Sequence, residues 1–117
     1  KGLWPALWML GDNITTVGWP SCGEIDIMEL IGGEGYNDKT TYGTIHWQDN
    51  GTHAQYGGTK TLASGKFADE FHVFSIEWDQ SSIHWLLDNV EFKSVNTTPA
   101  ELSEFQEKFF LIFNVEL

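Results

Sequence analysis

Three carboxylates lie in one short apolar segment, Gly-Glu-Ile-Asp-Ile-Met-Glu-Leu, at positions 23–30; they are Glu24, Asp26 and Glu29. A short, β-branched apolar run of this kind predicts a strand. Side chains alternate between the two faces of a strand, so Glu24 and Asp26 share a face while Glu29 falls out of phase. A single β-bulge around Ile27-Met28 would add one residue and bring Glu29 onto the face of the other two.

Carboxylates crowded into one strand repel each other, and this segment has no Lys or Arg to pair with them. A solvated outer face with salt bridges therefore fits less well than a site for glycoside hydrolysis, in which two carboxyl groups flank the scissile bond. A bulged strand could bring Glu24 and Glu29 to the separation of ~5–5.5 Å that retaining enzymes use. Three neighbouring carboxyls do not all ionise easily, so at least one pKa should rise.

The two glutamates would divide the chemistry between them. One stays ionised and attacks the anomeric carbon, and the other holds a proton and donates it to the leaving oxygen. Asp26, between them, would orient the nucleophile. The segment by itself leaves open which glutamate has which task.

The overall charge narrows the class of ligand. The chain has 117 residues and a net charge of −11, from 6 Lys and Arg against 17 Asp and Glu. Such a charge argues against nucleic acids, anionic membranes and sulfated polymers as partners. Aromatic residues make up 15% of the chain and include six Trp, which suits stacking against the flat faces of a neutral sugar.

The elements that must position the carboxylates are nearly all strands. Strands are predicted at 3–10, 23–31, 40–48, 71–79, 82–88, 90–95 and 109–116. A turn-rich loop is expected at 11–22, a glycine-rich turn at 32–38, a long surface loop at 49–66 and a helical turn within 97–108. The pattern predicts an all-β sandwich. Its strands are too few for two sheets with a binding face, so we expect residues 1–117 to be part of a larger single domain.

Other reactive residue types give weaker indications. The four histidines show no metal-ligand spacing, so no metal site is predicted. Trp4 and Trp8 are four residues apart and share a face of their strand, which we expect to be the core. The single cysteine, Cys22, is expected to be a small buried residue.

Several segments resemble a known family when taken in order: GLWPALWMLG, WPSCGEIDIMEL, TIHW, FHVFSIEWD, IHWLLDN and FFLIFNV. Together they resemble the central part of a laminarinase-type glycoside hydrolase of family sixteen. The resemblance implies a β-jelly-roll of two curved antiparallel sheets with an open cleft on the concave face, and endo-hydrolysis with retention. It also implies roles for single residues: Glu24 as nucleophile, Glu29 as acid/base, Asp26 as their assistant, and Trp19 and His46 lining the sugar sites.

The same resemblance bears on substrate and setting. With Met28 as an extra residue before Glu29, the motif resembles that of laminarinases, which act on β-1,3-glucans such as laminarin. Mixed-linkage enzymes of the family lack this extra residue. A mixed-linkage glucanase, a transglycosylase and a non-catalytic glucan-binding module remain as alternatives. The resemblance implies an extracellular protein, no required cofactor, and structural calcium only through ligands outside this segment. It implies flanking strands at both ends, and Glu116-Leu117 departs from the family's usual sequence at that point.

Overall fold

The computed structural model describes residues 2–32 and 38–117, so the turn expected at 32–38 lies outside the description except at its two ends. The strands are β1 (Trp4–Gly11), β2 (Glu24–Glu29), β3 (Thr40–Asp49), β4 (Thr52–Thr61), β5 (Phe74–Trp78), β6 (Ser82–Leu87), β7 (Val90–Asn96) and β8 (Phe109–Glu116). The helical elements are α1 (Ile14–Val17) and the 3₁₀ segments η1 (Phe67–Asp69) and η2 (Ala100–Gln106).

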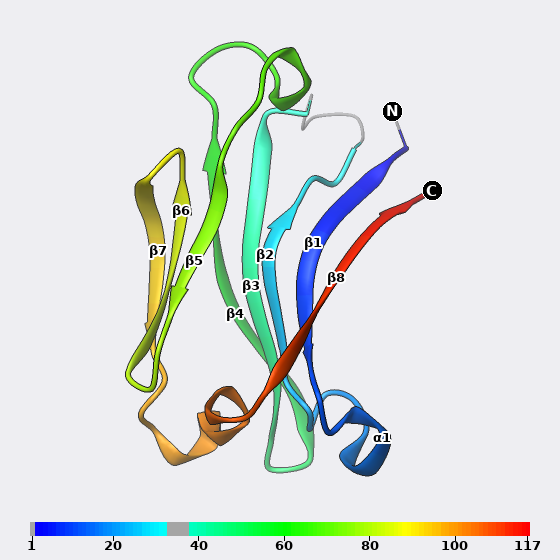
Figure 1. Cartoon of the computed structure of the whole chain (residues 1–117), viewed down its shortest axis with the longest axis vertical. Coiled ribbons are helices and arrows are strands. Elements are labelled where there is room, and N and C mark those ends of the chain that lie inside the picture. The colour runs from blue at the N-terminus through cyan, green and yellow to red at the C-terminus, as the bar shows by residue number, and fades with distance from the viewer. Residues whose placement is uncertain (1, 33–37) are drawn as a thin grey trace.

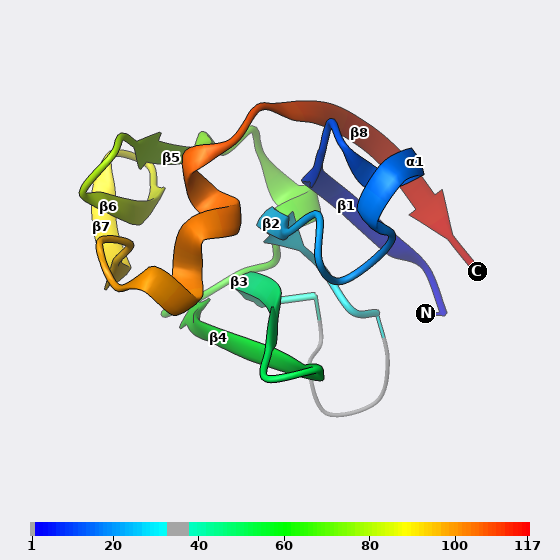
Figure 2. The ribbon, with the colours of Figure 1, turned by 90° about the horizontal axis from the view of Figure 1, so that it is seen from below.

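The strands form two antiparallel sheets, which confirms the predicted fold class. One sheet has the order β4-β3-β2-β1-β8 and the other has the order β5-β6-β7. The two sheets pack against each other, and their strands run roughly along the long axis of the molecule (Figure 1). Seen from below, the five-stranded sheet forms an arc whose hollow side is turned away from the three-stranded sheet (Figure 2). A curved sheet of this kind presents one face to the core and leaves the other free for a ligand.

The core lies between the two sheets and is closed at one end by η2. Its buried side chains come from β2, β3, β6 and η2: Ile25, Ile45, Ile83, Trp85, Leu102 and Phe105. Period-2 patterning explains this arrangement, because Ile83, Trp85 and Leu87 alternate along β6 with the less buried Ser82, His84 and Leu86. Burying each such large apolar side chain stabilises the fold by about 1.5–3 kcal/mol.

The predicted bulge is present in β2. On the β1 side the partners step from Leu7–Met28 to Trp8–Asp26, so Ile27 has no opposite residue. On the β3 side Asp26 pairs with Thr44 and Glu29 pairs with Tyr42, which sets three steps of β2 against two of β3. One extra residue in β2 therefore changes the phase of everything after Asp26.

The surface loop predicted at 49–66 is wrong over most of its length, because β4 runs through it and pairs with β3 from Thr52 to Thr61. The hairpin turns at Asn50-Gly51, where both residues have positive φ, the conformation that a two-residue Asn-Gly turn favours. β4 is the edge of its sheet and is largely exposed, so it lacks the apolar alternation that identifies a strand. Two glycines in its middle weaken the pattern further.

Smaller expectations have mixed outcomes. The predicted loop at 11–22 contains the short helix α1, and η2 lies where a helical turn was expected. Cys22 is buried, as predicted. Among the residues described here, no helix has the length and apolar character needed to cross a membrane.

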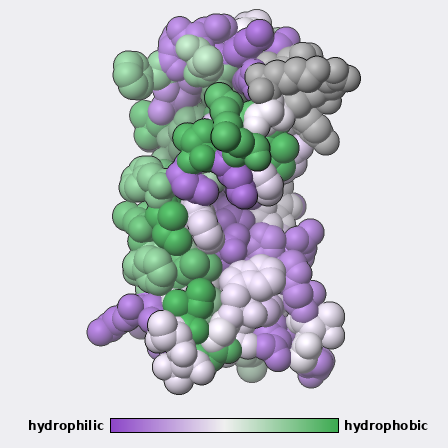
Figure 3. Space-filling view, turned by 90° about the vertical axis from the view of Figure 1, so that its right-hand side faces the viewer, coloured by the Kyte–Doolittle hydropathy of each residue, from purple (hydrophilic) through white to green (hydrophobic). Residues whose placement is uncertain are grey.

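One face of β8 is apolar but not covered. Phe109 packs against the core, and alternate residues after it share its face. Those residues, Leu111, Phe113 and Val115, are 57%, 74% and 61% exposed. Figure 3 views the molecule from the side on which β1 and β8 lie, and apolar residues gather there along one edge. We call Leu111, Phe113 and Val115 the β8 stripe.

Candidate active site

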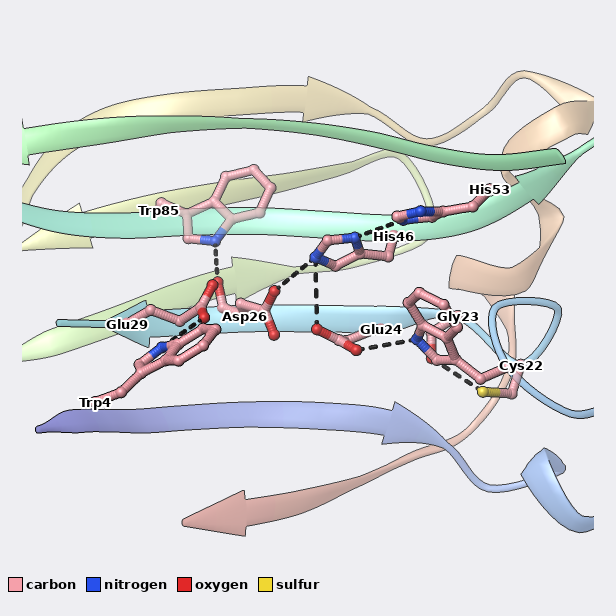
Figure 4. A network of polar contacts seen from close by, with 10 residues as sticks. Trp4, Cys22, Gly23, Glu24, Asp26, Glu29, His46, His53 and Trp85 are labelled. Atoms are coloured by element: carbon pink, nitrogen blue, oxygen red, sulfur yellow. Dashed lines mark hydrogen bonds and ion pairs between the residues drawn. The ribbon is translucent and has the colours of Figure 1, made fainter. Parts of the chain in front are cut away.

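The three carboxylates of β2 meet in one hollow. It is lined by residues of β1, β2 and β8: Trp4, Ala6, Trp8, Glu24, Asp26, Glu29, Asn114 and Glu116. Glu24 and Asp26 reach this face by simple alternation, and Glu29 reaches it because of the bulge at Ile27. Figure 4 shows the three side chains along one side of β2. The structure thus brings together all three residues that the sequence pattern singled out.

The three-stranded sheet supports the bulge through Trp85 of β6. A bulge leaves part of the backbone without a ladder partner, and here the buried Trp85 donates its indole N–H to the carbonyl oxygen of Asp26 at 2.9 Å (Figure 4). Gly43 makes room for the indole, because a Cβ at that position would lie 2.4 Å from Trp85 Cδ1. Trp85 and Gly43 therefore support the strand irregularity on which the carboxylate geometry depends.

Each glutamate accepts a hydrogen bond from a different tryptophan. Trp19 Nε1 donates to Glu24 Oε1 at 3.0 Å. Trp4 Nε1 donates to Glu29 Oε2 at 2.9 Å. Indole N–H groups are donors only, so both contacts favour the ionised form of the carboxylate they reach. The site therefore has two similar carboxylate–indole pairs, one for each proposed catalytic group.

The expectation that Trp4 and Trp8 belong to the core is wrong. Both line the hollow, and Trp8 Nε1 donates to Asn114 Oδ1 at 3.0 Å. The shared face was predicted correctly from their spacing, but spacing does not say which side of the sheet is covered. Ala6 and Trp8 pair with Glu29 and Asp26, which places the tryptophans on the carboxylate side.

His46 of β3 joins the carboxylates from the neighbouring strand. Its Nε2 atom lies 3.0 Å from Asp26 Oδ2 and 3.5 Å from Glu24 Oε2. Its other ring nitrogen, Nδ1, lies 2.9 Å from Nε2 of His53. The sequence pattern does not single out His53, because it predicts a surface loop at 49–66. The Asn50-Gly51 turn was the available indication, since a two-residue hairpin there returns position 53 to the vicinity of position 46.

Burial dominates the electrostatics of the three carboxyls. Burial, with a further contribution from Asp26, raises the pKa of Glu24 to about 8. Burial also raises the pKa of Asp26 to about 7. It raises the pKa of Glu29 as well, and the Trp4 N–H acts in the opposite direction. Near neutral pH the Glu24–Asp26 pair therefore holds a shared proton.

Among the described residues, one group of side chains could bind a metal ion: Glu24, Asp26 and His46. Ligand atoms of these three lie within 4.8 Å of one another. The same atoms are already engaged, since Asp26 and Glu24 face His46 and Glu24 also accepts from Trp19.

Two carboxyl groups in different hydrogen-bonded environments, with a third between them, suit acid–base and nucleophilic chemistry at one bond. Indole rings beside them offer stacking surfaces for a sugar. Trp19 is 48% exposed and its ring lies 6.1 Å from that of His46, so the two predicted sugar-site residues are neighbours.

Comparisons with known proteins also indicate a glycoside hydrolase. The sequence profile of "Glycosyl hydrolases family 16" matches residues 1–112. The solved catalytic domain of an endo-1,3-beta-glucanase (laminarinase) from Thermotoga petrophila RKU-1 is 41% identical, with a TM-score of 0.78, over 98% of this chain and 47% of that one.

Two curated relatives extend the comparison. The beta-glucanase of Rhodothermus marinus is 34% identical over 98% of this chain and 42% of its own length. The beta-1,3-glucan-binding protein of Penaeus monodon is 32% identical over 97% of this chain and 38% of its own length. The chain thus spans less than half the length of each of these three relatives.

Proposed function

The chain belongs to glycosyl hydrolase family 16, and on that basis we propose that it cleaves β-1,3-glucosidic bonds within β-glucans such as laminarin, with retention of anomeric configuration. The observation that carries the proposal is the β2 bulge, which places Glu24, Asp26 and Glu29 in one hollow. The excess of negative charge favours a neutral polysaccharide. A polymeric substrate also favours action outside the cell, which we propose as the protein's location.

In the first step an oxygen of the ionised Glu24 attacks the anomeric carbon. The bond from that carbon to the bridging oxygen breaks, and Glu29 gives its proton to the departing oxygen. The raised pKa of Glu29 suits this role, because burial favours the protonated form that acts as the acid. In the second step Glu29 takes a proton from water, whose oxygen displaces Glu24 from the sugar. No cofactor enters either step.

Asp26 would control the ionisation of the nucleophile. Burial raises the pKa of both Glu24 and Asp26, so the two neighbouring carboxyls share one proton in the resting site. Attack requires that proton to move to Asp26, which then donates a hydrogen bond to the Glu24 carboxylate. The Trp19 N–H and His46 both favour this reactive form, because each lowers the pKa of Glu24.

Substrate assays test the proposal directly. We expect new reducing ends from laminarin at a higher rate than from mixed-linkage β-glucan. Glu24→Gln and Glu29→Gln keep the side-chain shape but remove the charge or the proton, and each should lower the rate by roughly 10³-fold or more. Near-normal hydrolysis by either variant would refute the assignment. Faster hydrolysis of mixed-linkage glucan would support a mixed-linkage glucanase. Transfer of the glycosyl group to added acceptor sugars in place of water would support a transglycosylase.

A non-catalytic glucan-binding role is the second candidate, favoured by the similarity to the Penaeus monodon protein. All three carboxylates are present here and converge in one hollow, which favours catalysis over binding alone. The two roles differ in a simple measurement. Laminarin binding without any release of reducing ends over long incubation would establish the binding role, whereas turnover would exclude it.

A further inference from the structure

We propose that His53 is a positioning residue of this site: it fixes the ring orientation and tautomer of His46, which in turn holds Asp26 beside Glu24. The inference rests on the proposed glucan hydrolysis for its kinetic consequences, but its structural part can be tested without any substrate.

His53 reaches His46 through the β3–β4 hairpin. In the register, Gln48 lies opposite His53 and His46 lies opposite Gln55, so the two histidines are diagonal neighbours on adjacent strands. Their rings are stacked at an interplanar angle of 28°, with centroids 5.1 Å apart, and His46 Nδ1 lies 2.9 Å from His53 Nε2 (Figure 4). On its other side, the His53 ring lies 4.8 Å from that of Trp19. His53 thus contacts His46 and Trp19, each of which reaches Glu24.

The chemistry of imidazole determines which histidine donates the hydrogen bond in this contact. A neutral imidazole has one donor nitrogen and one acceptor nitrogen. His46 Nε2 faces the carboxylates of Asp26 and Glu24, at 3.0 and 3.5 Å, and an ionised carboxylate only accepts. The useful tautomer of His46 therefore carries its hydrogen on Nε2, which leaves Nδ1 as an acceptor. The N–H at Nε2 of His53 is the donor that this tautomer requires.

Removing His53 would leave Nδ1 of His46 to water, which donates and accepts equally well. The alternative tautomer and a rotated ring would then compete with the productive arrangement. Asp26 is 2% exposed and depends on His46 for its contact at Oδ2, so its orientation should suffer next. The expected defect is in the chemical step and not in sugar binding.

Three variants separate the possibilities. His53→Phe keeps a flat ring beside Trp19 but has no nitrogen, whereas His53→Gln keeps an N–H donor. His84→Phe is the matched control, because His84 lies on the other sheet and contacts Ser82 and Glu91. Two readouts apply to each protein: ring-nitrogen NMR of His46 in the free protein, and kcat and KM on a β-1,3-linked gluco-oligosaccharide.

We expect the His53→Phe variant to lose the pure Nε2–H tautomer of His46 and to lower kcat roughly 10-fold, with KM within about twofold. His53→Gln should restore most of kcat, and His84→Phe should match the unmodified protein. An unchanged His46 tautomer in the His53→Phe variant would overturn the proposal, as would a rise in KM alone, which would make His53 a sugar contact. If the unmodified protein hydrolyses nothing, the proposed function fails, while the NMR readout still decides whether His53 positions His46.

Discussion

At the scale of single residues, each glutamate accepts an indole N–H from its own tryptophan. Trp19 donates to Glu24 and Trp4 donates to Glu29, and each contact lowers the pKa of its carboxyl against the larger effect of burial. If Glu24 must be ionised and Glu29 protonated, the ionisation of Glu24 sets the acid limb of kcat/KM. The ionisation of Glu29 sets the alkaline limb.

Trp19→Phe should therefore move the acid limb to higher pH, because Glu24 loses a donor that stabilises its anion. Trp4→Phe should instead move the alkaline limb to higher pH, because the pKa of Glu29 rises. Trp8→Phe is the control: Trp8 donates to the neutral Asn114, and neither limb should move. Profiles of kcat/KM against pH for the three variants provide the measurement. Equal shifts of both limbs in all three would contradict the assignment of separate donors.

The buried carboxyls should also make the fold less stable as pH rises. Unfolded Asp and Glu have pKa values of about 4. The folded protein raises the pKa of Glu24 to about 8 and of Asp26 to about 7, so the folded chain keeps protons that the unfolded chain releases. The contribution of this pair to stability is thus complete below about pH 4 and is lost as pH rises through 7 and 8.

Asp26→Asn removes one of these ionisations. We expect the variant to melt a few degrees above the unmodified protein at pH 8, to show a smaller difference at pH 5, and to lose most activity. Thermal unfolding at the two pH values provides the test. A variant that is less stable at pH 8 would mean that the Asp26 carboxylate stabilises the fold, contrary to the raised pKa.

At the scale of elements, the bulge in β2 is the feature that converts an ordinary strand into a site. Its support comes from the second sheet, through the hydrogen bond from Trp85 to Asp26 O and the close approach at Gly43. Gly43→Ala would push the indole away from the bulge. Overpacking of this kind costs about 1–3 kcal/mol of stability.

We expect Gly43→Ala to reduce kcat by more than its loss of stability explains, because the displaced Trp85 no longer fixes Asp26. Ile83→Val, a change in the same core cluster, is the control and should lower stability by about 0.5–1.5 kcal/mol with little effect on kcat. Thermal unfolding and kcat would be measured at a temperature where both variants are folded. Equal kcat in the two variants would show that the bulge does not depend on Trp85.

Sequence patterns predicted most elements because their apolar residues alternate or cluster as strands require. Glu29 is an odd number of residues from Glu24 and Asp26, and this spacing predicted a bulge near Ile27-Met28. The registers of β2 confirm the bulge. β4 escaped prediction because an exposed edge strand has little apolar signal. The positions of Trp4 and Trp8, and the contact of His53, depend on which face the second sheet covers and on how hairpins fold back. Local spacing does not contain that information.

At the scale of the whole molecule, the two sheets cover each other only in part. The three-stranded sheet packs on the β2–β4 half of the larger one, while the β8 stripe (Leu111, Phe113 and Val115) stays exposed toward the opposite edge. An unpaired edge strand with an apolar face is a site for association. The 117-residue chain produced alone should therefore form oligomers through this stripe.

Leu111→Lys combined with Phe113→Lys should raise the monomer fraction measured by sedimentation. Val90→Lys is the control, since Val90 is 62% exposed but lies outside the stripe, beside the β6–β7 turn. If the unmodified 117-residue chain is monomeric at the same concentration, the stripe does not drive association.

The central claim is that Glu24 forms a covalent bond with a β-1,3-linked glucan during turnover. The most direct measurement uses a β-1,3-linked gluco-oligosaccharide with fluorine at C2 of its reducing-end sugar and a good leaving group at C1, which slows release of the glycosyl-enzyme. Mass spectrometry of the protein and its peptides then locates the adduct. We predict one glycosyl unit per chain, attached to Glu24 and absent from the Glu24→Gln variant. An adduct on Glu29 or another residue, or leaving-group release without any adduct, would contradict the account.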